Sequence, residues 1–105
     1  MYIYDKDPTA AAELFSNKQW KAAALYKSEQ YNKSIDELNN INTADAHYNK
    51  GNAYAKLGQT GKAIEEYTAA LKLNPEHKDA KYNKELLEQQ KSKKNHKNSK
   101  KKNNK

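Results

Sequence analysis

The sequence predicts an all-α protein in which short antiparallel helix pairs stack into a solenoid. The clearest observation is an internal repeat, since DAHYNK at residues 45–50 recurs as DAKYNK at residues 79–84. Five of the six residues are identical across an offset of 34 positions, and a period near 34 is typical of stacked helix pairs. Composition agrees, because valine is absent while the helix-favouring alanine, leucine, lysine, glutamate and glutamine are abundant.

A weaker repeat precedes the first one. The segment KSEQYNKSIDEL at residues 27–38 is similar to KLGQTGKAIEEY at residues 56–67, at an offset of 29 positions. Lysine, glutamine, lysine, isoleucine and glutamate coincide, and the exchanges Ser/Ala, Asp/Glu and Leu/Tyr are mild. We therefore expect a degenerate helix pair before the well-formed one.

Helix boundaries follow from local signals. Asp7 followed by Pro8 is typical of a helix start, and Thr43 is a suitable N-cap. Gly58 suits the left-handed residue that follows a helix, and Pro75 prevents a helix from continuing. Six helices are expected, at about residues 8–15, 18–28, 31–39, 43–57, 60–73 and 76–90.

The end of the chain differs from the rest in charge. Residues 91–105 contain eight lysines, no acid and no aliphatic side chain, whereas the preceding ninety residues hold 12 Lys against 13 Asp plus Glu. The net charge of +7 therefore belongs to this tail, and its composition predicts disorder. The expected organisation is a lead-in at 1–7, degenerate helices at 8–42, a repeat at 43–77, a capping helix at 78–91 and a disordered tail at 92–105.

The repeat combines small residues, where two helices would cross, with bulky residues beside the crossing. Gly51 and Ala63 are the small pair, and added volume at either would overpack the interior. Tyr54 and Tyr67 are the bulky pair. Together they predict a closely crossed helix pair.

Two further positions complete the pattern, with Ala70 small toward the next repeat and Pro75 as terminator. Residues 44–77 resemble a tetratricopeptide repeat (TPR), with six of eight signature positions met, and the resemblance implies a right-handed solenoid. His47 and Lys50 depart from the usual Trp-like residue and Leu, so we expect looser contacts there. Residues 18–42 resemble a degenerate repeat of the same kind.

A wider resemblance covers most of the folded part. The motifs are F…W…A-x-Y followed by TADAHYN-x-GNA. They are similar to the TPR region of bacterial aerotolerance-type (Bat) proteins, in which a von Willebrand factor A domain and membrane helices precede the repeats. The resemblance implies a membrane-associated or periplasmic setting. Without it we expect a soluble, cytoplasmic chain, since no apolar run approaches the roughly 20 residues that cross a bilayer.

Several kinds of chemistry are not supported by the sequence. There are no cysteines, and His47, His77 and His96 share no metal-ligand spacing. Neither a glycine-rich phosphate loop nor a nucleophile constellation is present. We therefore expect no enzyme, no metal and no cofactor. Arginine is absent and the folded part is close to neutral, which does not favour nucleic acid as the partner.

Candidate binding residues follow from helix periodicity. Tyr48 and Tyr82 occupy equivalent places on the face that lines the concave groove in TPR proteins, where packing and ligand binding are about equally expected. Asn52 and Lys56 continue the stripe at four-residue intervals, and two residues of the degenerate repeat extend it. The peptide-carboxylate clamp of chaperone-binding TPRs is incomplete, because Tyr48 stands where a lysine is usual. The predicted groove residues are Tyr48, Asn52, Lys56, Tyr82, Tyr26 and Lys27.

Binding of another protein or peptide in the concave groove is the predicted function. One alternative is an adaptor for nucleic acid or an anionic membrane that acts through the basic tail. Another is a purely structural role, in which these repeats stack on further repeats.

Overall fold

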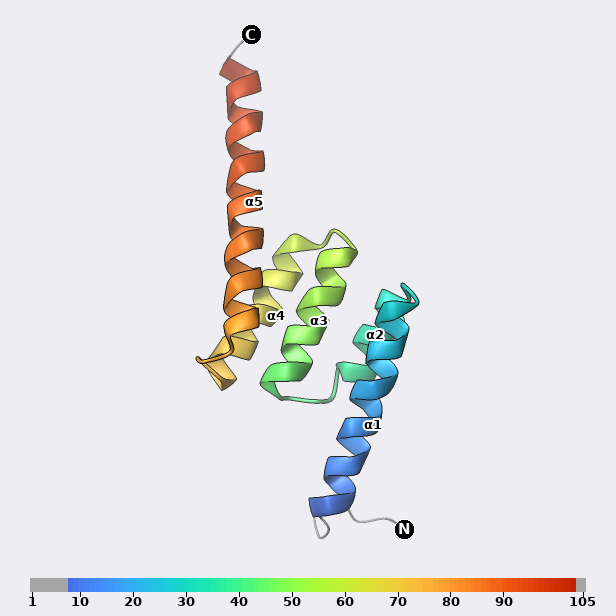
Figure 1. Cartoon of the computed structure of the whole chain (residues 1–105). Helices are drawn as coiled ribbons and strands as arrows, with labels where there is room; N and C mark the ends of the chain where they lie inside the picture. The colour runs from blue at the N-terminus through green and yellow to red at the C-terminus, as the bar shows by residue number, and fades with distance from the viewer. Residues whose placement is uncertain (1–7, 104–105) are drawn as a thin grey trace.

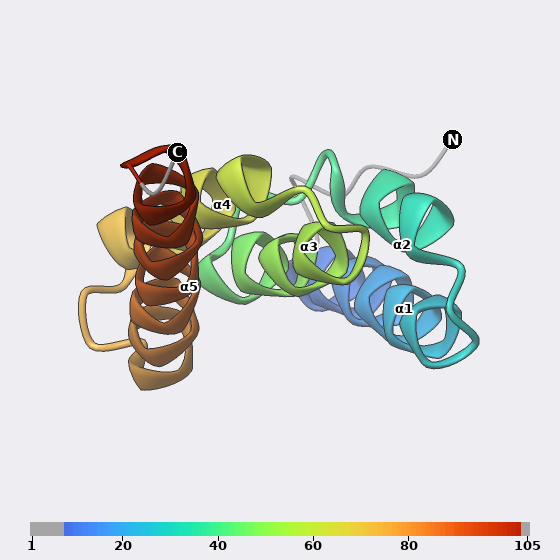
Figure 2. The ribbon, with the colours of Figure 1, turned by 90° about the horizontal axis from the view of Figure 1, so that it is seen from above.

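The computed structural model describes residues 8–103, with side chains from 17 to 93, and this part of the chain consists of helices with no strand. Consecutive helices run side by side in opposite directions (Figure 1). From above, α2 and α4 form one layer over α1 and α3, and α5 closes the row at the end opposite α1 (Figure 2). The predicted all-α helical repeat is thus confirmed. The helices are α1 Pro8–Lys27, α2 Tyr31–Leu38, α3 Ala44–Lys56, α4 Thr60–Leu73 and α5 Lys78–Asn103.

The expected break between the first two helices is wrong. Residues 8–15 and 18–28 belong to one helix, so the described chain has five helices rather than six. Ser16 and Asn17 stand at the expected break, and each costs only a few tenths of a kcal/mol relative to good helix formers. Without glycine or proline there, the helix continues.

The last helix differs in length from the expectation of an end near Gln90, since α5 is drawn to Asn103 and projects well beyond α4 (Figure 1). No glycine or proline follows Pro75, and lysine is itself a good helix former. The helix starts at Lys78, where the sequence suggested about residue 76. Disorder of the tail at 92–105 stays a prediction.

The two helix hairpins have matching turns, which supports the degenerate repeat. Gly58 has φ +78° after α3, as expected, and Glu29, 29 positions earlier, has φ 63° after α1. The amide of Gln59 donates to the carbonyl of Tyr54 at 2.9 Å, and that of Gln30 donates to Leu25 at 2.8 Å. Both turns therefore end their helix in the same way, although the left-handed conformation costs about 1–2 kcal/mol for a residue other than glycine.

Two buried clusters hold the helices together. Between α1, α2 and α3 the Ser34 hydroxyl is buried and donates to the Ala22 carbonyl at 2.8 Å, which fixes the crossing of the degenerate pair. Small side chains at both positions permit this approach. The first cluster consists of Ala22, Leu38, Ile41 and Ala46, and the second of Ala63, Tyr67, Ala70 and Ala80.

Candidate functional site

The crossing of α3 and α4 depends on Gly51. A Cβ atom at this position would lie 2.5 Å from Cε1 of Tyr67, whose ring is 1% exposed and cannot move aside. Ala63 and Ala70 are fully buried, as the repeat pattern requires. Tyr54 is half-buried beside the crossing, where the Lys62 ammonium lies 5.7 Å from its ring centroid.

The two departures from the repeat pattern join one polar cluster. Lys50 is only 6% exposed, and its ammonium lies 3.5 Å from Oε1 of Glu66. The same oxygen lies 2.7 Å from Nδ1 of His47, whose Nε2 lies 2.7 Å from Oδ1 of Asn42. Glu66 on α4 thus neutralises a buried lysine on α3, and hydrogen bonds replace the apolar contacts that the pattern would provide. Looser contacts were expected at His47 and Lys50, but the polar cluster that these residues form with Glu66 was not predicted.

Asn52 is held in place by its neighbours. The Tyr67 hydroxyl donates to Oδ1 of Asn52 at 2.6 Å, and the side-chain Nδ2 of Asn83 donates to the same oxygen at 3.1 Å. Burial raises the pKa of Tyr67 to about 12, so the phenol is a neutral donor at physiological pH. With its oxygen used twice, Asn52 has only its amide N–H groups to offer a ligand.

The other residues of the predicted stripe differ in their exposure. Tyr48 is half-buried, with its ring centroid 5.9 Å from that of Tyr67 and 4.8 Å from that of His77. It therefore contributes to the contact between α3, α4 and α5. Lys56 is exposed, and Tyr82 is 65% exposed on α5.

A hollow of about 160 Å³ lies between α1 and α3, and it brings three of the predicted residues together. Tyr26 and Lys27 line it from α1, and Asn52 from α3, whereas the predicted Tyr48, Lys56 and Tyr82 do not line it. Burial, and secondarily the nearby Tyr31, raises the pKa of Tyr26. We call this space the first hollow, lined by Ala22, Ala23, Tyr26, Lys27, Ser34, Asn49 and Asn52.

A second, shallower hollow adjoins the first and shares Ala23, Lys27 and Asn49 with it. Its outer wall is Trp20, which is 77% exposed and is the one tryptophan of the chain. Lys27 was a predicted groove residue, whereas Trp20, Ala23 and Asn49 were not predicted. The offset of 29 positions could have identified them, because it places Trp20 level with Asn49 and Ala23 level with Asn52. Gln19 completes the lining of the second hollow.

The described residues show neither a metal site nor a membrane span. Within residues 17–93, no group of three or more His, Asp or Glu side chains converges as metal ligands would. Among the described helices, none combines the length and the apolar composition of a membrane span.

The fold and the paired helices define a helical repeat protein, in which each pair contacts mainly its neighbours. Residues 44–77, which comprise α3, α4 and the linker after them, match the tetratricopeptide repeat family model. Repeats of this family generally mediate interactions between proteins. No curated protein matches the chain significantly. The resemblance to Bat proteins therefore stays a prediction.

Proposed function

We propose that the protein is a non-catalytic interaction module that holds a peptide or helix of a partner protein against α1 and α3. The match of residues 44–77 to a repeat that generally binds proteins supports the class. The first hollow carries the specific proposal, because Tyr26, Lys27 and Asn52 converge there from two repeats. The resemblance to Bat proteins extends it, since the partner would then belong to a membrane-associated von Willebrand A/TPR assembly.

The fixed position of Asn52 favours binding. Its side chain is already oriented by Tyr67 and Asn83, so little conformational freedom is left for a ligand to remove. Ordering a flexible side chain on binding costs about 0.5–1.5 kcal/mol. A preformed amide donor next to an apolar hollow suits the backbone carbonyl and one side chain of a bound segment.

Filling the first hollow tests the proposal. Ala23→Phe adds a ring at its exposed wall without entering the buried clusters, and Ala24→Phe adds the same ring at an exposed position outside both hollows. Both variants should keep their unfolding free energy within about 0.5 kcal/mol of the original. Proteins captured from the native cell should be lost with Ala23→Phe and retained with Ala24→Phe, as measured by quantitative mass spectrometry. Equal capture by both variants would show that binding uses another surface.

A second candidate function rests on the charge of the tail. Eight lysines without an acid at residues 91–105 suit RNA or an anionic membrane, whereas the rest of the chain has a formal charge of −1. Binding of the full chain to RNA and to phosphatidylserine vesicles should weaken steeply with salt. Deleting residues 91–105 should abolish this binding. The melting temperature should stay within a few degrees. Salt-insensitive binding by the shortened chain would contradict this candidate.

A further inference from the structure

We infer that the two adjoining hollows between α1 and α3 bind an acidic segment of a partner protein, with a carboxylate side chain next to an apolar one. The inference rests on the proposed function and adds the chemistry of the ligand. It has three independent supports, which are the charges around the hollows, the hydrogen-bonding groups in them, and their apolar walls.

The charge that lines both hollows is positive, because Lys27 belongs to both linings and neither lining contains Asp or Glu. The described part of α1 from residue 17 to 27 contains Lys18, Lys21 and Lys27 and no acid. Lys21 pairs with Glu37 of α2 at 2.9 Å, whereas Lys27 forms no ion pair with the side chains described between 17 and 93. An ammonium with no carboxylate beside it in either lining attracts an anionic ligand.

Two hydrogen-bonding groups of the first hollow can only donate, whereas the Tyr26 hydroxyl can donate or accept. The Lys27 ammonium can only donate, and Asn52 has only its N–H groups left because its oxygen accepts from Tyr67 and Asn83. Asn49 can turn its amide either way. Such a set fits a ligand rich in acceptors, as carboxylates and backbone carbonyls are.

The walls supply the apolar part of the site. Ala22, Ala23 and Tyr26 line the first hollow from α1. Trp20 lines the second hollow, and most of this residue is exposed to solvent. Exposed tryptophan is enriched among the residues that dominate protein interfaces. An apolar side chain in the first hollow would place the next residues of the segment against Trp20.

The chain's own tail does not fit these hollows. Residues 91–105 carry eight lysines and no acid, so Lys27 would repel them. An acidic segment of another protein is the occupant whose charge complements the site.

The experiment uses the full chain and a display library of random twelve-residue peptides with amidated C-termini. Amidation removes the terminal carboxylate, so any enriched acid is a side chain. Peptides that also bind the Ala23→Phe variant are discarded, which removes those held by the tail. We expect enrichment of Asp or Glu adjacent to Leu, Ile, Met or Phe, and binding that changes the fluorescence of Trp20, the one tryptophan of the protein.

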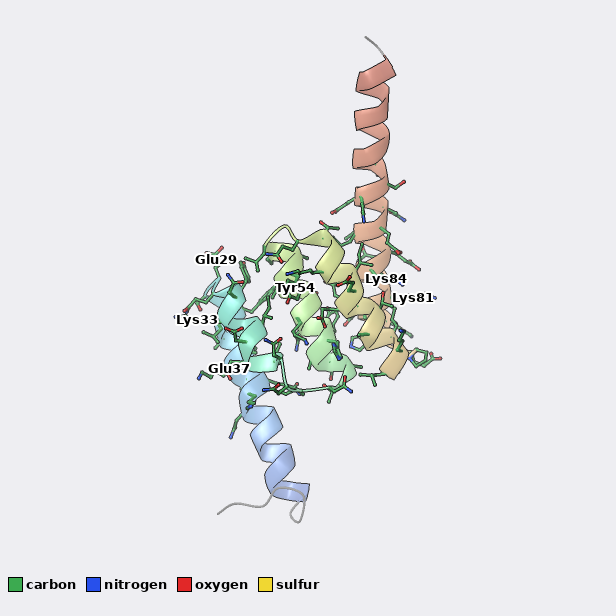
Figure 3. The ribbon with its side chains drawn as sticks, turned by 180° about the vertical axis from the view of Figure 1, so that it is seen from behind. Glu29, Lys33, Glu37, Tyr54, Lys81 and Lys84 are labelled. Carbon is green, nitrogen blue, oxygen red and sulfur yellow. The ribbon has the colours of Figure 1, made fainter. Side chains whose placement is uncertain are left out.

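Charge reversal provides the matched control. Lys27→Glu should weaken the selected peptides at least about tenfold, since attraction at the rim becomes repulsion. Lys33→Glu should leave their affinity within about twofold, because Lys33 is an exposed lysine of α2, in the other layer (Figure 3).

The remaining outcomes distinguish a failure of the proposed function from a failure of the acidic ligand alone. If no peptide distinguishes the original protein from Ala23→Phe, the proposed function is wrong. If neutral or basic peptides are enriched, or Lys27→Glu has no more effect than Lys33→Glu, the hollows bind peptides but the inference that the ligand is acidic is wrong. If Trp20 fluorescence changes with protein concentration alone, a second copy covers the hollows and the inference fails.

Discussion

The helices α3 and α5 begin with almost the same residues, yet within the described chain only α3 is followed by a helix that packs against it. Residues 45–50 read DAHYNK and residues 79–84 read DAKYNK, and Ala46 and Ala80 are both fully buried against the preceding helix pair. The face toward the preceding pair is therefore conserved between the two helices. The face toward a following partner is not, because Glu85 and Glu88 stand 34 positions after Gly51 and Tyr54.

This difference explains where the described solenoid ends. On α5 the face that would receive a partner helix carries Lys81 and Lys84, which Figure 3 labels. Together with Glu85 and Glu88 they line a surface hollow against Leu71. Glutamate cannot permit the close crossing that Gly51 permits on α3. A polar outer face is what a terminal helix of a repeat protein requires. A few residues per helix therefore determine whether stacking continues, while the rest of the repeat stays recognisable.

Exchanging the residues at the crossing gives the largest expected effect. Gly51→Glu places a side chain within 2.5 Å of the Tyr67 ring and an unpaired charge in the interior, so it should cost at least about 3 kcal/mol. Glu85→Gly on exposed α5 should cost only about 0.5–1 kcal/mol, through helix propensity. Urea unfolding followed by circular dichroism measures both. Similar losses in the two variants would mean that the crossing does not depend on glycine.

The polar cluster on α3 gives a smaller effect. His47 and Lys50 meet Glu66, whereas no helix packs over their counterparts Lys81 and Lys84 on α5 within the described chain. Glu66→Ala leaves the buried Lys50 ammonium without its counter-charge and should cost about 1–3 kcal/mol.

The neighbouring glutamate is the matched control for that substitution. Glu65 is exposed, and Glu65→Ala should change the unfolding free energy by less than about 0.5 kcal/mol. Restoring stability in Glu66→Ala by adding Lys50→Leu would confirm that the unpaired lysine is the cause. No recovery in the double variant would contradict it.

Local signals in the sequence were sufficient for most of the fold. Thr43 accepts a hydrogen bond from the Ala46 amide as an N-cap should, Gly58 takes the left-handed conformation, and α4 ends two residues before Pro75. The left-handed Glu29 was not foreseen, because nothing in its side chain signals that conformation.

Contacts between distant residues were harder to predict. His47 and Glu66 are 19 positions apart, and only the crossing of α3 and α4 brings them to 2.7 Å. Asn52 was predicted as a groove residue from its periodicity, and it does line the first hollow. Its bond to Tyr67, however, makes it part of the scaffold as well. Periodicity gives the face of a helix on which a residue lies but not the atoms that meet it.

The Tyr67 hydroxyl gives the smallest effect, and it links the α3–α4 crossing to the groove. Tyr67→Phe removes the donor to Asn52 while Asn83 still donates, so it should cost about 1 kcal/mol at neutral pH.

The pKa of Tyr67 is raised from 10.0 to about 12 by burial, so the unfolded chain loses this proton at a lower pH than the folded one. The stability contributed by the neutral phenol is therefore fully present below pH 10 and is lost as the pH rises toward about 12. The difference in unfolding free energy between the original and Tyr67→Phe should accordingly shrink and then reverse over this range. Comparing the two chains cancels the other groups that titrate there, and a difference that stays constant from pH 8 to pH 12 would show that the phenol is not held neutral.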